Sequence, residues 1–171
     1  MKTLPLLLTL ALAGTSAAVA AVDKPEPTRV VVNFFEPEKF TDVKDGSFGT
    51  DKGRDATLKE LRDYIVERAE KALPAGQKLS VTFLDVDLAG DYEPWRGPRM
   101  DDVRIVKDIY PPRFKLAFRI LNEAGDTVKE GERQLTDLAF MSRLTINRQD
   151  PLRYEKDMLN DWIRSDVRTK S

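Results

Sequence analysis

The chain of 171 residues contains neither cysteine nor histidine. Without imidazole it cannot form a Ser-His-Asp triad, and without imidazole and thiolate it lacks the usual ligands of zinc, haem and iron–sulfur clusters. A Walker glycine loop and a dinucleotide-binding fingerprint are also missing. These absences exclude most common enzyme classes, so we assign no catalytic residue, no metal ligand and no cofactor from sequence motifs.

The chain also has no excess of one charge. Lys and Arg number 28 and Asp and Glu 29, for a net charge of -1. Nucleic-acid-binding proteins usually carry a strongly basic face, so we do not expect a nucleic-acid partner. Carboxylates, lysine amines and tyrosine hydroxyls remain available for chemistry, and carboxylate oxygens for calcium or magnesium.

The first twenty residues have the pattern of a cleavable secretory signal. Lys2 gives a positive start, Leu4–Ala13 is an apolar run too short to span a bilayer, and Ala18–Ala20 is a small-x-small cleavage site. We expect cleavage near Ala20 and a mature protein in the periplasm or outside the cell. Ala21 stands where a lipoprotein needs cysteine, which excludes a lipid anchor. No later segment has the ~18 apolar residues that a spanning helix needs.

About 151 residues remain after cleavage, which is enough for one domain with an ordinary hydrophobic core. We expect a flexible tether over residues 21–29, a single domain over 30–167 and a short tail over 168–171. The order β-α-β-β-β-β-α predicts a two-layer α+β fold, with one mixed, mostly antiparallel sheet of about five strands and two helices packed on one face. The predicted strands cover residues 30–35, 79–88, 103–110, 113–121 and 127–135, and the helices cover 55–73 and the segment after Asp150.

Two patterns predict more than the elements themselves. The apolar residues from Leu58 to Leu73 recur at helical spacing between two strands, which favours a parallel strand pair joined by a right-handed crossover. A hairpin closed at Ala124-Gly125 sets Arg119 opposite Glu130 and leaves a bare backbone opposite the ring of Phe118.

An acidic segment ends the second predicted strand. Asp85 and Asp87 lie on the same strand face, and Asp91 follows in the turn. Such carboxylates can hold a hard cation, but a calcium loop fails here because Ala89 and Arg96 occupy its fifth and twelfth positions. The structural alternative is that the aspartates cap the turn or pair with nearby arginines.

The long loop after this strand, residues 89–102, gathers an indole with guanidinium groups. Trp, Tyr and Arg are the usual anchors of binding surfaces, and a long irregular loop is often functional. The alternative is that Trp95 folds back onto the sheet as a lid. The candidate binding residues are Trp95, Arg96, Arg99, Tyr110 and Arg113, together with Asp85 and Asp87.

Three functional hypotheses follow. The first is a non-enzymatic domain that binds an envelope protein or glycan through the loop around Trp95 and the neighbouring strand ends. The second is a carboxylate hydrolase acting on an envelope substrate, with Asp85, Asp87 or Glu93 as acid and base. The third is an oxygen-ligand site for calcium or magnesium at the same aspartates. Oligomeric state is not predicted by the sequence.

Several short blocks resemble the bacterial family called domain of unknown function 3016. They are Asp85–Gly90, Ile109–Arg113 and Tyr154–Trp162, and Val32–Asp42 looks like the opening of that family. The likeness covers about Arg29 to Val167. It implies a secreted or periplasmic protein of proteobacteria, without an established activity, cofactor or partner, so no functional residue can be carried over from it.

Overall fold

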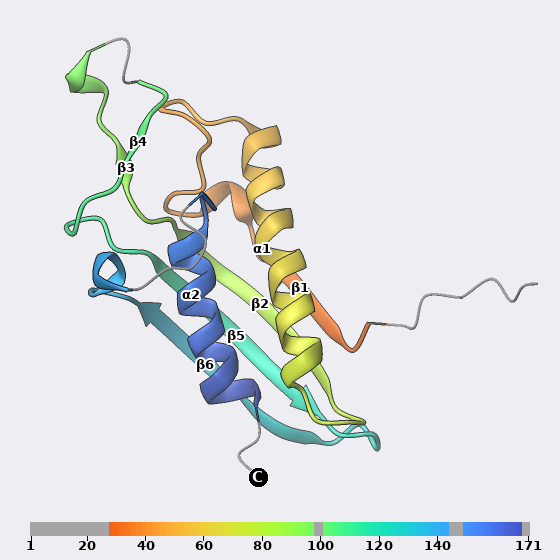
Figure 1. Cartoon of the computed structure of the whole chain (residues 1–171). Helices are drawn as coiled ribbons and strands as arrows, with labels where there is room; N and C mark the ends of the chain where they lie inside the picture. Colours follow the sequence, from red (N-terminus) through yellow and green to blue (C-terminus); the bar gives the residue numbers. More distant parts are fainter. Residues whose placement is uncertain (1–27, 98–100, 144–148, 169–171) are drawn as a thin grey trace, which may run out of the picture.

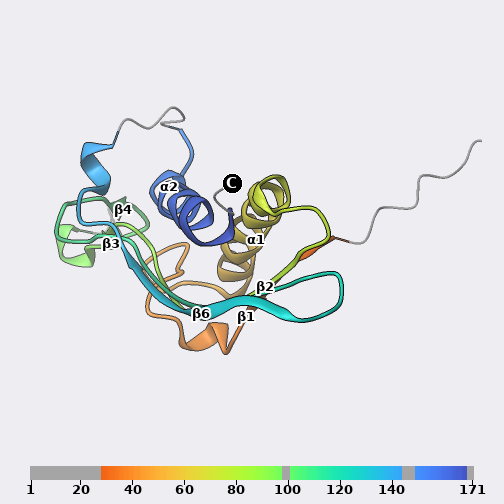
Figure 2. The same ribbon diagram turned by 90° about the horizontal axis from the view of Figure 1, so that it is seen from below.

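A computed structural model describes residues 28–97, 101–143 and 149–168 (Figure 1). Its main elements are β1 (Val30–Phe34), α1 (Asp51–Ala72), β2 (Lys78–Asp87), β5 (Arg113–Leu121), β6 (Thr127–Thr136) and α2 (Arg153–Trp162). The four strands form one sheet in the order β1-β2-β5-β6. Both helices cover the same face of this sheet (Figure 2). The predicted α+β class, with a mixed sheet and two helices on one face, is therefore confirmed.

Strand pairing follows the two sequence patterns. β1 is parallel to β2, with α1 as the crossover, while β2-β5 and β5-β6 are antiparallel. In the hairpin, Arg119 lies opposite Glu130 and their side chains form an ion pair of 2.8 Å. Phe118 lies opposite Gly131, as predicted. The hairpin register was predictable because the alternation and the turn residues agree.

The strand predicted over residues 103–110 differs from the structure. Only β4 (Arg104–Ile105) is extended, and it pairs with β3 (Asp91–Tyr92) in a separate two-stranded sheet. The chain turns after β4, where the backbone N–H of Tyr110 donates to the carbonyl of Lys107 at 3.0 Å. Residues 91–97 and 101–105, with the 3-10 turn η2 (Pro94–Arg96), project beyond the end of the main sheet (Figure 1). We call this segment the arm.

The core lies between the helices and the sheet. The predicted stripe of α1 is buried at Leu58, Leu61, Ile65 and Ala69. On α2 the ring of Trp162 is 2% exposed and packs edge-on against the ring of Phe118, with 5.8 Å between centroids. Full burial of an aliphatic or phenyl side chain stabilises the folded state by about 1.5–3 kcal/mol, and large rings such as these contribute several kcal/mol each. These contacts fix α2, and therefore the chain that precedes it, against the sheet.

The start of α2 differs from its sequence pattern. Asp150 followed by Pro151 is typical of a helix cap and a first helical position, but the helix begins at Arg153, with Leu152 at the N-cap and no side-chain capping hydrogen bond. Asp150 Oδ1 instead accepts from the backbone N–H of Leu152 at 2.8 Å, in the turn that contains Pro151. Glu155 is buried on the core side of α2.

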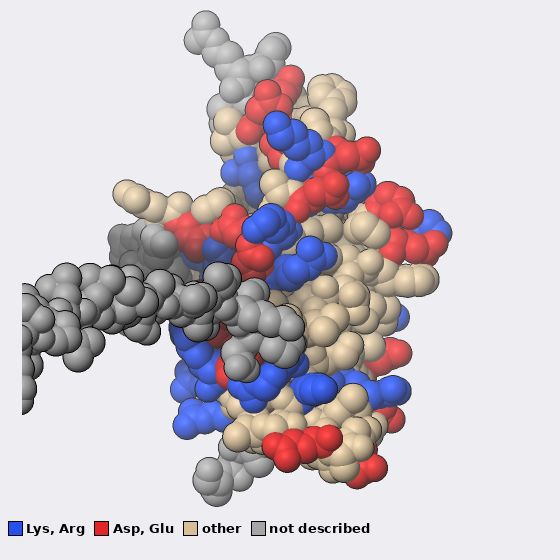
Figure 3. Space-filling view, turned by 90° about the vertical axis from the view of Figure 1, so that its right-hand side faces the viewer, with Lys and Arg blue, Asp and Glu red and all other residues tan. Residues whose placement is uncertain are grey.

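On the solvent side of α1, two ion pairs each join residues that lie one turn apart: Lys59–Asp63 at 2.5 Å and Lys71–Glu67 at 2.6 Å. Exposed pairs of this spacing contribute only a few tenths of a kcal/mol each. On the side of the molecule shown in Figure 3, Lys and Arg are interspersed with Asp and Glu. The buried stripe of α1 therefore decides its position, and its charges keep its outer face solvated.

Gly90 connects β2 to the arm in a conformation that other residues rarely adopt. Its φ is +83°, its N–H donates to the carbonyl of Tyr110 at 3.0 Å, and its carbonyl accepts from Arg104 at 3.0 Å. A Cβ at this position would lie 2.8 Å from the carbonyl oxygen of Ile105. The close approach of three backbone segments therefore requires glycine here.

Replacing Gly90 should destabilise the protein more than replacing Gly125. Gly125 also has a positive φ, +89°, but a Cβ there would meet nothing within 4 Å. We expect Gly125→Ala to cost about 1–2 kcal/mol of unfolding free energy for its backbone conformation alone, and Gly90→Ala to cost more because of the added collision. Urea unfolding of both variants measures the difference, and equal losses would show that the collision is relieved at no cost.

Candidate functional site

The candidate acidic residues lie where β2 ends beside the start of β5. Asp87 is the register partner of Arg113, and Asp85 is that of Lys115. Val86 between them is fully buried, so both aspartates point to the sheet face opposite the helices. The predicted common face of the two carboxylates is thus present at this end of the sheet.

Asp85 holds a loop. Its Oδ1 accepts from the backbone N–H of Thr41 at 2.8 Å, and its Oδ2 accepts from the Thr41 hydroxyl at 2.8 Å. Oδ1 also accepts from the N–H of Val86 at 2.9 Å. All of these contacts are internal, so Asp85 has a structural role, although it holds the loop after β1 instead of capping the turn after β2 or pairing with an arginine.

The loop that Asp85 holds brings a further carboxylate to the strand end. Asp42 forms an isolated parallel bridge with Asp87, because its N–H donates to the carbonyl of Val86 and its carbonyl accepts from Leu88, both at 3.0 Å. Arg104 of the arm binds both oxygens of Asp42, at 2.8 and 3.1 Å. Asp42 was missed by the sequence analysis, since nothing near it in the chain indicates a partner 62 residues away.

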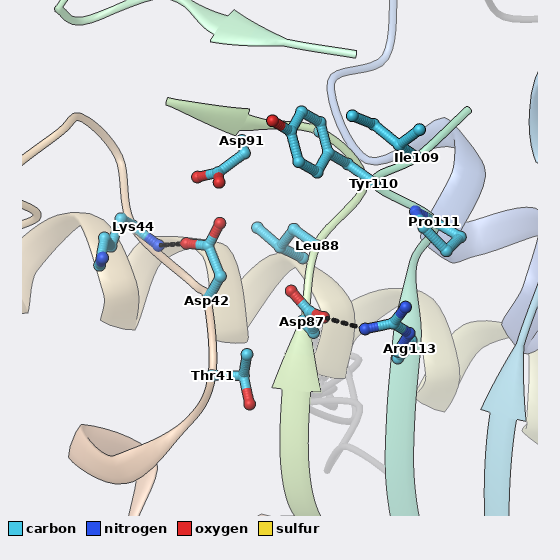
Figure 4. Close-up of a pocket in the computed structure, with 11 residues that line it drawn as sticks. Thr41, Asp42, Lys44, Asp87, Leu88, Asp91, Ile109, Tyr110, Pro111 and Arg113 are labelled. Carbon is cyan, nitrogen blue, oxygen red and sulfur yellow. Dashed lines mark hydrogen bonds and ion pairs between the residues drawn. The ribbon is translucent and has the colours of Figure 1, made fainter. Parts of the chain in front are cut away.

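These segments enclose a cavity of about 290 Å³ (Figure 4). Asp87 and Arg113 point toward each other on one side of it, with 3.6 Å between Oδ2 and Nη1. Residues 41–44, 87–91 and 109–113 contribute its walls, and we call it the strand-end pocket. Its lining residues are Thr41, Asp42, Lys44, Asp87, Leu88, Gly90, Asp91, Ile109, Tyr110, Pro111 and Arg113.

Asp87 is the titratable group that the pocket perturbs most clearly. Burial raises its pKa to about 6, against the opposing effect of the Arg113 charge, and the negative charges of Asp42 and Asp85 also favour the protonated form. Its side chain is 20% exposed. A half-neutralised carboxyl near pH 6 is therefore present in a polar cavity.

A second carboxylate, Glu93, organises the arm. The residue is 1% exposed, and its oxygens accept from Lys107, from Arg96 and from the hydroxyl of Tyr110, the last at 3.1 Å. The hydrogen bond from Lys107 and those from Arg96 and Tyr110 lower the pKa of Glu93 to about 2. Glu93 is thus ionised at neutral pH and joins three parts of the chain.

Trp95 lies between Glu93 and Arg96 in sequence but has a different environment. Its side chain is 71% exposed on η2, so the alternative of a lid folded onto the sheet is wrong. Arg96 is held by Glu93. Arg99, the remaining arginine of the predicted loop set, lies outside the described residues. The arm therefore presents a solvated indole beside a fixed guanidinium.

The geometry bears on the hydrolase and cation hypotheses. Neither Asp85 nor Glu93 lines the strand-end pocket, and the oxygens of both accept from protein donors. Of the three proposed acid or base residues only Asp87 faces this cavity. Within the ranges that the structure describes, no group of three or more acidic side chains is placed to hold a metal ion.

A family model described as "Protein of unknown function (DUF3016)" matches residues 28–165. The chain belongs to this family. The match confirms the resemblance predicted from its sequence blocks. The strand-end pocket, the arm and both helices lie within the matched region, which ends inside η4 (Ile163–Val167). Searches of curated proteins and of solved structures found no match. Across the described residues, no helix is long and apolar enough to cross a membrane.

The raised pKa of Asp87 generates a pH-dependent prediction. A carboxyl whose pKa is higher in the folded state than in the unfolded state reduces stability when it ionises, so its penalty is absent below about pH 4 and complete above about pH 6. Asp87→Asn should therefore be more stable than the wild type at pH 7.5, by about 1–2 kcal/mol after allowance for solvent in the pocket, and equally stable at pH 3.5.

Thermal unfolding of both proteins from pH 3.5 to 7.5 measures this difference. Glu130→Gln is the control, because Glu130 is an exposed carboxylate of β6 that is paired with Arg119 of β5. A pH-independent difference between Asp87→Asn and the wild type would show that burial does not raise this pKa.

Proposed function

We propose that this DUF3016 protein is a non-enzymatic binding domain that acts in the periplasm or outside the cell. The residue pattern 1–20 supports export, and the lack of cysteine is compatible with an oxidising compartment. The internal bonding of Asp85 and Glu93 favours recognition over acid–base chemistry. The partner that we infer is an envelope protein with an apolar pocket for an aromatic side chain.

One observation carries this proposal: an indole that is 71% exposed stands on an arm whose base is fixed. Glu93 ties η2 to Lys107 and Tyr110, and Arg104 ties β4 to Asp42. A preorganised aromatic loses little conformational entropy on binding, which is why Trp and Tyr dominate the hot spots of protein interfaces.

A protein partner is favoured over a glycan by the groups around Trp95. Arg96 and Glu93, its nearest polar neighbours in sequence, bind each other. Sugar hydroxyls would need free polar groups beside the ring. Other large apolar side chains are exposed at this end of the molecule, namely Phe48 at 95% and Val103 at 42%. The hydroxyl of Ser47 donates to the carbonyl of Asp101, which brings the loop of Phe48 beside the arm.

The test begins with a photoreactive amino acid at position 95 and, as a control, at position 128 in living cells. Val128 is an exposed apolar residue, 54% exposed, on the β5-β6 hairpin. We expect a discrete protein adduct from position 95 alone. The partner is then identified, purified and titrated against the wild type, Trp95→Ala and Val128→Ala.

Trp95→Ala should weaken that complex about thirtyfold, the effect of losing a hot spot worth ~2 kcal/mol. Val128→Ala should leave the affinity unchanged. Equal affinity of the wild type and Trp95→Ala, or equal labelling from the two positions, would refute the role of the arm. Attachment of position 95 to cell-wall glycan alone would assign the arm to a glycan instead.

Export has a direct test of its own. Expression with residues 1–20 in place should yield a mature protein whose first residue is Ala21, because the small side chains of Ala18 and Ala20 fit the cleavage site. Mass spectrometry of the periplasmic and cytoplasmic fractions measures this. Full-length protein in the cytoplasm only would contradict the proposed location.

A further inference from the structure

The strand-end pocket contains a carboxylate whose hydrogen-bonding capacity is unused. Among the described residues no donor makes a hydrogen bond to the carboxylate of Asp87, although this side chain is only 20% exposed. Its contact with Arg113, at 3.6 Å, is an ion pair longer than a hydrogen bond. Buried polar groups are normally satisfied, so a partly buried carboxylate without a donor indicates room for one.

The pocket still carries charges of both signs once its internal pair is set aside. Arg104 neutralises Asp42 through two hydrogen bonds. Asp87 and Asp91 then remain as carboxylates, and the Arg113 guanidinium reaches the cavity without a hydrogen bond to the described part of the protein. A site with both signs complements a ligand that also carries both, rather than a simple anion or cation.

The spacing of the loose pair specifies the ligand further. In an α-amino acid the ammonium nitrogen lies about 2.5 Å from the carboxylate carbon, by standard backbone dimensions. Such a group can lie head-to-tail along the Asp87–Arg113 pair, whose charged atoms are 3.6 Å apart. The one loose ion pair would then be replaced by two charge-assisted hydrogen bonds to the ligand, which are among the stronger polar contacts.

The remaining walls of the strand-end pocket and its volume indicate the kind of side chain that the ligand carries. Leu88, Pro111 and Ile109 give the cavity an apolar portion. Since a water molecule occupies about 30 Å³ of the liquid, a cavity of about 290 Å³ has room for about ten non-hydrogen atoms. An amino acid with a small or medium apolar side chain has this size.

We propose that the strand-end pocket binds a small apolar amino acid, with Asp87 accepting from its α-ammonium group and Arg113 donating to its α-carboxylate. This site is separate from the interface proposed for the arm, because Trp95 does not line the pocket.

The experiment is an NMR titration of the mature, isotope-labelled protein with leucine up to about 10 mM, a range that covers affinities near 1 mM. We expect shifts of the amides of Gly90, Tyr110 and Arg113, with little change at the far end of the β5-β6 hairpin, around Gly125. N-acetylleucine lacks the ammonium charge and leucinamide lacks the carboxylate, so each should bind at least tenfold more weakly. Both D- and L-leucine are tested.

Matched variants assign the two contacts. Asp87→Asn and Arg113→Ala should each weaken leucine binding at least tenfold. Glu130→Gln and Arg119→Ala, which alter the ion pair between Arg119 of β5 and Glu130 of β6, should leave leucine binding unchanged. Trp95→Ala should also leave it unchanged. If Asp87→Asn or Arg113→Ala fails to fold, the comparison of leucine with its two analogues on the wild type decides alone.

Three results would overturn the proposal. The first is the absence of shifts with both enantiomers of leucine and with alanine. The second is binding of leucinamide or N-acetylleucine as tight as that of leucine, which would mean a site for one charge. The third is equal binding of glucose, which would mean a neutral polar site. None of these results affects the arm, whose test uses a different partner and a different residue.

Discussion

The ion pair between Asp42 and Arg104 is the contact on which the strand-end pocket and the base of the arm depend. The guanidinium binds both carboxylate oxygens and also donates to the carbonyls of Gly90 and Lys44. It lies 4.7 Å from the ring centroid of Tyr92, close enough for a cation–π contact. One side chain thus fastens the arm, the turn after β2 and the loop after β1 to each other. Without this ion pair, neither the walls of the strand-end pocket nor the base of the arm would be held in place.

Three carboxyl groups at this end of the molecule show how the surroundings of a carboxyl group set its pKa. Glu93 is surrounded by donors and has its pKa lowered to about 2. Glu155 is buried with one donor, the N–H of Ala89 at 2.6 Å, and burial raises its pKa to about 6. Asp87 has a similarly raised pKa and lines the strand-end pocket, while Glu155 lines a second cavity of about 290 Å³ and its Oε2 has no hydrogen-bond partner among the described residues. Burial and adjoining space alone therefore do not indicate a functional carboxyl; Asp87 is distinguished by its ion pair with Arg113.

Much of the fold was predictable because local signals agreed with each other. The alternation in β5, the stripe of α1 and the turn at Gly125 each specify one structure, and together they predicted the parallel pair of β1 and β2 and the hairpin register. The segment 103–110 failed for the opposite reason. Its β-branched residues favour a strand. However, the bond of Arg104 to Asp42 holds the first part of the segment in the arm, and the last part forms a turn in which the N–H of Tyr110 donates to the carbonyl of Lys107.

The site was predictable in part. Asp87, Arg113 and Tyr110 were selected from composition near strand ends, and the structure brings all three to one cavity. Asp42 and Lys107 were missed because their roles depend on contacts between distant segments, which periodicity does not report. Asp85 and Arg96 have internal partners that only the tertiary structure reveals. Residue type can nominate a surface anchor, whereas the fold decides which polar atoms remain available.

The two outer strands of the sheet have consequences for self-association. β1 pairs with β2 only as far as Phe34, and the edge then resumes at the single bridge of Asp42, with Pro37 in the bulging segment between them. On the other edge, β6 directs Lys129 and Arg133 inward to Asp166. Interrupted strands and inward-pointing charges both discourage the addition of a further strand from another chain. In the part of the chain that the structure describes, the helices cover only one face of the sheet, and both of its edges are poor templates for a fibril.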